Sequence, residues 1–159
     1  MISSSSVLNR FFLIPSLIVL LFDLATKTIF RYADLSTQGL IAIRPTTNTG
    51  TLFSLFSTTE GINLIFIILS FLALALLYYF LVTEQPFSSS TMVKVASGII
   101  AGGIVGNLID RLFFGAVFDW ISVWKWPIFN IADTGIVIGV CLLMLLLIKE
   151  IKQDGTVIS

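Results

Sequence analysis

Two aspartates flank a short aromatic stretch between two very apolar segments, and they are the residues best placed to do chemistry. Asp110 closes the first segment and Asp133 opens the second. An ionisable group inside or at the rim of a membrane span is costly to keep, which makes it a candidate functional group. Two carboxylates in contact do not both ionise cheaply, so one keeps its proton while the other acts as a base. The sequence therefore predicts that Asp110 and Asp133 meet, share a proton and activate water against a peptide carbonyl.

The residues alone leave other roles open for this pair. The same carboxylates could form a proton or cation site in a small transporter. Each could also be paired with a nearby Arg or Lys, and Arg111 stands directly beside Asp110. From these residues alone, we rank a protease only modestly above a transporter.

An asparagine precedes each aspartate at the same spacing: Asn107 stands three residues before Asp110, and Asn130 three before Asp133. Residues at this spacing share one face of a helix, so each amide can hydrogen-bond its own aspartate or a substrate backbone. One such asparagine is more often an interhelical hydrogen bond. Two asparagines in matching positions favour a functional site.

Three further groups carry weaker signals. Asp23 and Lys27 form an acid-then-base pair, four residues apart, near the end of the first apolar segment. That orientation stabilises a helix by only about 0.2–0.5 kcal/mol, so an interfacial ion pair is the simpler interpretation. Asn48 and Gly50 could form a turn, and Asp119 in the aromatic stretch could be a solvated charge.

The composition makes the chain an integral membrane protein. Of its 159 residues, 57% are hydrophobic and only 11% are charged, and the mean hydropathy is +1.03. A soluble domain carries about 25% charged residues. The formal net charge is zero and the sequence has no Lys/Arg cluster, so nucleic-acid binding is not expected.

The sequence contains no histidine, which excludes Ser-His-Asp and Cys-His catalysis and histidine-ligated zinc. Cys141, the single cysteine, lies in an apolar run, where a thiol is more often a packing group than a nucleophile. We therefore expect neither a metal nor a cofactor. Catalysis must use carboxylates, lysine, tyrosine or hydroxyls.

The hydropathy pattern predicts an all-α membrane protein with four transmembrane helices in one domain, residues 1–159, because about 20 apolar residues cross the hydrocarbon. The expected spans are residues 10–30, 61–82, 91–113 and 130–148. Residues 31–60 form a small extracytoplasmic element that could hold a sheet. Residues 114–129 contain all three tryptophans and form a loop at the membrane interface.

Small residues recur every four positions in the third span, at Gly98, Gly102 and Gly106, and let another helix backbone approach closely. Asp110 is the next position on this ridge. An even number of spans puts both termini on one side of the membrane. Basic residues divide almost evenly between the two faces, so the positive-inside rule does not give the orientation.

Five blocks of sequence follow one another along essentially the whole chain. They are Asp23-Leu-Ala-Thr-Lys27, Asn48-Thr-Gly50-Thr-Leu-Phe53, Gly102-Gly-Ile-Val-Gly-Asn-Leu-Ile-Asp110-Arg111, Val117-Phe-Asp119 and Phe129-Asn-Ile-Ala-Asp133. In content, order and spacing the chain resembles lipoprotein signal peptidase (signal peptidase II), the bacterial membrane aspartyl protease. Gly-Asn-Leu-Ile-Asp-Arg and Phe-Asn-Ile-Ala-Asp are each highly specific.

The resemblance implies that Asp110 and Asp133 are the catalytic dyad. It also implies substrate-binding or supporting roles for Asp23, Lys27, Asn48, Gly50, Gly103, Asn107, Arg111, Asp119, Asn130 and Ala132. The implied reaction removes signal peptides from diacylglyceryl-modified prolipoproteins by cleavage on the N-terminal side of the lipidated cysteine. The enzyme would act without a cofactor, as a monomer surrounded by membrane lipid. It would lie in the bacterial cytoplasmic (inner) membrane, with cytoplasmic termini and its active site towards the outer leaflet.

The chain departs from the family pattern at Thr51, Leu52 and Trp120, near the expected substrate slot. These departures bear on substrate preference rather than on chemistry.

Two other classes of protein compete with this interpretation. One is a non-enzymatic proton or ion conductor. The other is a presenilin-like intramembrane protease, but its Gly-x-Gly-Asp signature is missing because Asp110 follows Asn-Leu-Ile.

The absence of histidine predicts that activity survives removal of metal ions. Cleavage of a lipidated prolipoprotein, followed by gel shift, should proceed at the same rate with and without EDTA. Loss of activity in EDTA that zinc restores would show that the carboxylates act as metal ligands.

Overall fold

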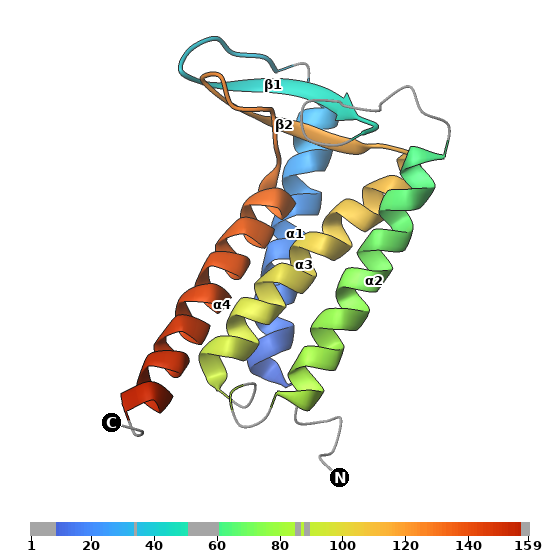
Figure 1. The fold of residues 1–159 in the computed structure, drawn as a ribbon. Helices are drawn as coiled ribbons and strands as arrows, with labels where there is room; N and C mark the ends of the chain where they lie inside the picture. Colours follow the sequence, from blue (N-terminus) through green and yellow to red (C-terminus); the bar gives the residue numbers. More distant parts are fainter. Residues whose placement is uncertain (1–8, 34, 51–60, 85–86, 88–89, 157–159) are drawn as a thin grey trace.

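The computed structural model describes residues 9–33, 35–50, 61–84, 87 and 90–156 of the chain. Within them lie α1 (Arg10–Tyr32), β1 (Ile41–Asn48), α2 (Ile62–Thr83), α3 (Thr91–Phe114), β2 (Val117–Val123) and α4 (Ile131–Thr156). The helices run side by side, and the two strands lie across one end of the bundle (Figure 1). α1 begins and α4 ends at the opposite end.

Four helices in the described chain are long and apolar enough to cross a membrane, which confirms the predicted fold class of four spans with a small sheet. Each begins at or next to the expected residue. α4 continues to Thr156, past the expected end at residue 148. Thr51 and Leu52, two of the departures from the family pattern, lie outside the described residues.

α3 is the central helix of the bundle and packs against each of the other three (Figure 1). Its apolar window is 61% buried, whereas the windows of α1, α2 and α4 are 17%, 6% and 17% buried. The other three helices therefore expose most of their apolar surface, as spans facing lipid do.

The predicted glycine ridge lies in the seams between α3 and its neighbours. A Cβ added at Gly98 or Gly102 would collide with the backbone carbonyl of Phe12 or Ser16 on α1. A Cβ at Gly103 would collide with the carbonyl of Ala132 on α4. The small residues thus let two helix backbones approach α3 at once.

The sheet differs from the prediction in where its second strand comes from. β1 pairs antiparallel with β2, from Ile41 opposite Val123 to Asn48 opposite Val117. β2 lies inside residues 114–129, which we expected to be a loop, so the sheet joins two distant parts of the chain. The register shifts between Ile43 and Thr46, where the strand contains Pro45. Proline cannot donate to a ladder and is tolerated at such an irregularity.

The tight α1–α3 seam predicts that Gly102→Val destabilises the protein. The added isopropyl group, whose Cβ alone would collide with the Ser16 carbonyl, must displace that backbone, so we expect a loss of about 1–3 kcal/mol, measured as a lower Tm in detergent. Ala75→Val, on the exposed face of α2, is the matched control and should leave Tm unchanged. Equal Tm values for the two variants would mean that the seam is not tightly packed.

Candidate active site

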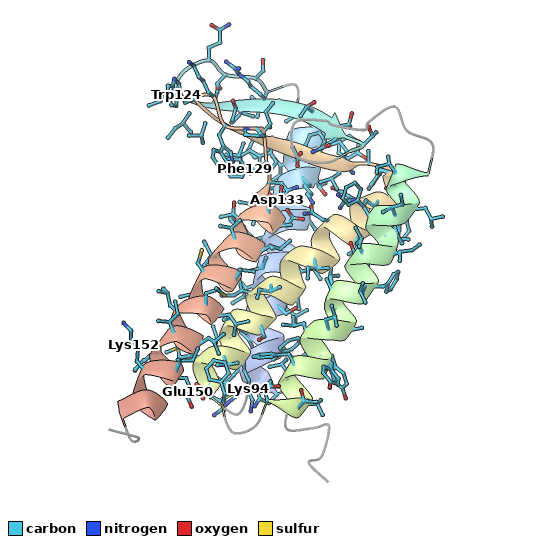
Figure 2. All side chains as sticks on the ribbon, viewed as in Figure 1. Lys94, Trp124, Phe129, Asp133, Glu150 and Lys152 are labelled. Carbon is cyan, nitrogen blue, oxygen red and sulfur yellow. The ribbon has the colours of Figure 1, made fainter. Side chains whose placement is uncertain are left out.

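A cavity of about 990 Å³ lies between the sheet and the adjoining ends of α2, α3 and α4. Its charged and amide side chains are Asn48, Asn107, Arg111, Asp119 and Asp133. Asp133 lies at the sheet end of α4, beneath the strands (Figure 2). Four of the five blocks that carry the family resemblance therefore contribute a polar side chain to one cavity.

The first turn of α4 orients Asp133. The backbone N–H of Asp133 donates to Asn130 Oδ1 at 2.8 Å, and the backbone N–H of Asn130 donates to Asp133 Oδ2 at 3.3 Å. This reciprocal pair is the geometry of a capping box, which satisfies two of the N–H groups that a helix start leaves free. The three-residue spacing between Asn130 and Asp133 therefore has a local structural cause.

Asn130 also holds a second carboxylate. Its Nδ2 donates to Asp119 Oδ1 at 2.7 Å, and Asn48 Nδ2 donates to the other oxygen of Asp119 at 3.2 Å. Asn130 is fully buried and Asp119 is 2% exposed. One asparagine thus fixes Asp119 and Asp133 relative to each other in the cavity wall.

Asn107 does not bond the aspartate on its own helix. Its Nδ2 donates to Asp133 Oδ1 at 2.7 Å, and its Oδ1 accepts from Lys27 Nζ and from Asn130 Nδ2, both at 3.0 Å. Of the two roles expected for each asparagine, a bond to the aspartate three residues later or to a substrate backbone, Asn107 does not fill the first, and it lines the cavity. It is an interhelical link to Asp133.

Asp110 is buried beneath the cavity and does not line it. Its Oδ2 lies 3.1 Å from Lys27 Nζ and accepts the backbone N–H of Phe118 at 3.0 Å. Its Oδ1 accepts from Arg31 Nη2 at 2.9 Å. Both oxygens of Asp110 are occupied by these donors, whereas the oxygens of Asp133 accept from Asn107 and Asn130. The alternative of a carboxylate paired with cations applies to Asp110, through Lys27 and Arg31 rather than Arg111.

Asp23 and Lys27 form a buried ion pair of 2.7 Å rather than an interfacial one. The three N–H donors of Lys27 match its three partners, Asp23, Asp110 and Asn107. Asp23 Oδ1 accepts the backbone N–H of Ala132 at 2.9 Å, at the N-terminus of α4. The pair therefore ties α1 to both α3 and α4.

The two buried aspartates act alike on the backbone. Asp110 accepts the N–H of Phe118, the residue before Asp119. Asp23 accepts the N–H of Ala132, the residue before Asp133. Each buried carboxylate thereby anchors the chain beside one of the cavity carboxylates.

The contacts of Gly50, Gly103 and Ala132 give each of these predicted site residues a structural role. The Gly50 N–H donates to Asn48 Oδ1 at 3.1 Å, so the expected turn forms and leaves Asn48 Nδ2 free to reach Asp119. Ala132 is fully buried against Gly103, at one of the close approaches between α3 and α4. Larger side chains would separate the helices that carry Asn107 and Asp133.

Arg31 was missed by the sequence analysis. Its guanidinium lies over the Phe114 ring, 3.8 Å from the centroid, as well as bonding Asp110. The available signal was its position four residues after Lys27, which continues the spacing of Asp23 and Lys27 along one face of α1.

The cavity shifts the protonation of Asp119. Burial, together with the nearby charge of Asp133, raises the pKa of Asp119 to about 7. Hydrogen bonds from Asn48 and Asn130 and the charge of Lys27 act in the opposite direction without cancelling the rise. Near neutral pH this carboxyl is therefore held as an acid in a large part of the molecules.

Residues 15–149 match the model of the family described as Signal peptidase (SPase) II. The chain belongs to the signal peptidase II family. It is 40% identical over 110 residues to the lipoprotein signal peptidase of Anaplasma phagocytophilum, an alignment that covers 67% of this chain and 68% of the relative. The lipoprotein signal peptidase of Geobacter metallireducens is 34% identical over 156 residues, covering 92% and 95%.

The fold agrees with this assignment. A solved structure of a bacterial membrane enzyme matches with a TM-score of 0.75 and 27% identity, covering 96% of this chain and 92% of that one. The resemblance predicted from the sequence blocks is confirmed. As a signal peptidase II, the protein is a multi-pass membrane peptidase of lipoprotein signal-peptide processing.

Proposed function

We propose that this signal peptidase II is an aspartic endopeptidase whose catalytic dyad is Asp119 and Asp133. It removes the signal peptide from diacylglyceryl-modified prolipoproteins by cleaving on the N-terminal side of the lipidated cysteine. The observation that carries the assignment of the dyad is the bridge through Asn130, which bonds both carboxylates in the wall of the cavity.

Asp119 replaces Asp110 as the partner of Asp133 for two reasons. A catalytic carboxyl must reach the substrate, and Asp119 lines the cavity whereas Asp110 does not. A shared proton also requires carboxyls that are not neutralised by cations. Asp110 is bonded to Lys27 and Arg31, while Asp119 is bonded to two neutral asparagine amides.

The roles of the pair follow from their surroundings. Asp119, with its pKa raised to about 7, donates a proton to the scissile carbonyl oxygen. Asp133 accepts from N–H donors on both oxygens, including the backbone N–H of Asn130 before α4, and serves as the base that takes a proton from water. The resulting hydroxide adds to the carbonyl carbon. Asp133 then passes the proton it took from water to the peptide nitrogen, the C–N bond breaks, and Asp119 takes back a proton from a hydroxyl of the diol as the product carboxyl forms.

The remaining cavity residues serve the substrate. Arg111, Thr46 and Thr47 line the space in which an extended peptide would lie. The cavity continues along α4 past Thr134 to Ile138, and Val137 there is 61% exposed. This apolar extension suits the acyl chains and the hydrophobic signal segment, which remain in contact with the bilayer.

We place the termini in the cytoplasm and the sheet at the outer leaflet of the bacterial cytoplasmic membrane, and we propose that the monomer is the active unit. An ion conductor is disfavoured by where the charges lie. The buried charged side chains of the described spans are Asp23, Lys27 and Asp110, which form one cluster bonded to Asn107 and to the starts of β2 and α4. They do not continue as a polar path through the bundle.

Carboxylate substitutions test the dyad. Asp119→Asn and Asp133→Asn each remove an acid–base group and should lower kcat by roughly a thousandfold without unfolding the protein. In the wild type, kcat/KM should fall as pH rises through about 7, because Asp119 loses the proton it must donate. The assay is cleavage of a lipidated prolipoprotein between pH 5 and 9, with about half-unit steps.

Asp110→Asn is the discriminating variant. It leaves Lys27 and Arg31 short of a negative partner, so it should lower Tm. The charge-balanced double variant Asp110→Asn/Arg31→Gln removes one charge of each sign and should recover part of that loss. Both should cleave with the pH profile of the wild type. If instead the balanced variant is folded and inactive while Asp119→Asn cleaves normally, the dyad is Asp110 and Asp133.

The apolar extension of the cavity predicts that the enzyme requires prior lipidation. Each buried CH₂ contributes about 0.8 kcal/mol, and this remote binding energy holds the scissile bond against the dyad. A prolipoprotein without the diacylglyceryl group should show kcat/KM lower by at least about a hundredfold, mostly through a higher KM. The measurement compares two substrates identical except for the lipid, in one bilayer system. Equal kcat/KM values would indicate a general membrane peptidase.

A further inference from the structure

α2 is the least embedded helix of the bundle, and it contacts the candidate active site at one end. Only 6% of its apolar window is buried, and its packing partner among the described helices is α3. Its fully buried side chain, Leu81, packs against Val93 at the end far from the sheet. At the sheet end, Asn63 and Phe66 contact Arg111 by two different kinds of interaction.

Asn63 holds the backbone of Arg111. Its Nδ2 donates to the Arg111 carbonyl at 3.1 Å. That carbonyl also accepts the N–H of Gly115, at 3.2 Å, where α3 ends in a left-handed residue. The last turn of a helix has few intrahelical partners, so a second donor to this carbonyl restrains the turn that carries Arg111.

Phe66 holds the side chain of the same residue. The guanidinium carbon of Arg111 lies 4.9 Å from the centroid of the Phe66 ring, and both residues line the cavity. A cation over an aromatic face is attracted to the ring quadrupole, and the attraction grows where water is excluded. In the part of the chain that the structure describes, Arg111 has no carboxylate within ion-pair distance. The ring therefore orients the guanidinium. Arg111 Nη1 also donates to the Asn107 carbonyl at 3.4 Å, and among the described residues the other N–H donors of the guanidinium remain available.

We propose that Asn63 and Phe66 are positioning residues that hold the Arg111 guanidinium in the cavity, ready to bond a backbone carbonyl of the substrate peptide. The proposal rests on the proposed function. It gives the loosely packed α2 a specific task, since both contacts lie within its first two turns. A neutral ring suits this task because an acidic partner would compete with the peptide for the same N–H donors.

The first test varies the ring. Phe66→Leu keeps apolar volume but removes the aromatic face, and should lower kcat/KM for a lipidated prolipoprotein on the order of tenfold, mainly through KM. Phe66→Tyr keeps the face and should restore most of the activity. Phe71→Leu, on the exposed side of α2, is the matched control and should behave as wild type. The Tm of all three should stay close to that of the wild type.

A double-mutant cycle separates positioning from packing. The background is Asp133→Asn, which we expect to bind substrate and to cleave it too slowly to disturb the measurement. The Kd of the lipidated prolipoprotein is measured in this background for Phe66→Leu, Arg111→Lys and the two combined. If Phe66 acts through Arg111, the combined Kd change should fall well short of the product of the single changes. Multiplicative changes, or Phe66→Leu cleaving as fast as Phe71→Leu, would overturn the proposal.

The controls keep this inference distinct from the proposed function. Cleavage by the wild type and its loss in Asp133→Asn test the function itself. If both are observed and Phe66→Leu is nevertheless normal, only the positioning role falls. Asn63→Asp is a further check, because a carboxylate cannot donate to the Arg111 carbonyl. It should raise KM, and an unchanged KM would exclude Asn63 from the mechanism.

Discussion

The buried ammonium of Lys27 is the contact on which the sheet end of this bundle depends. It is 1% exposed and reaches Asp23 on its own helix and Asp110 and Asn107 on α3. Taking charges out of water costs several kcal/mol per ion unless each is paired and hydrogen-bonded. Here Lys27 and Arg31 balance two aspartates, so the cluster is neutral. Loss of one partner would leave an unpaired buried charge, at a cost of about 3–5 kcal/mol. Because any shift between α1 and α3 would incur this cost, the cluster holds the two helices in one register.

That cluster also shapes the cavity without entering it. Its two carboxylates accept the backbone N–H groups of Phe118 and Ala132. These residues stand immediately before Asp119 and Asp133, the first on a strand and the second in the opening turn of α4. A rigid ionic core therefore sets the backbone position of both cavity carboxyls, while Asn130 sets the direction of their side chains. Precise placement of this kind matters because small displacements of catalytic groups cost large factors in rate.

The sequence was sufficient to predict the four spans, because a long apolar run has few alternatives to a transmembrane helix. The motif blocks were sufficient to identify the family. The sequence did not point to Asp119, the aspartate that we propose as the partner of Asp133. Asp110 and Asp119 both precede Asp133 at short range, and the choice depends on where Lys27 and Arg31 reach from α1, a contact across about eighty positions of sequence. β2 was missed for a related reason: its partner, β1, lies far away in the chain, and the tryptophans around it indicate a membrane interface whether or not the backbone is paired.

In the proposed mechanism, the distribution of cations explains why the site contains four aspartates although only two take part in the reaction. Lys27 and Arg31 are committed to Asp23 and Asp110, and Arg111 lies against an aromatic ring. Asp119 is thus left buried with amide partners, and burial raises its pKa to about 7. Had either inner cation reached Asp119 instead, the carboxyl would ionise at a lower pH and could not act as an acid near neutrality. The inner aspartates therefore do more than hold helices together: by occupying the cations, they leave the outer pair able to share a proton.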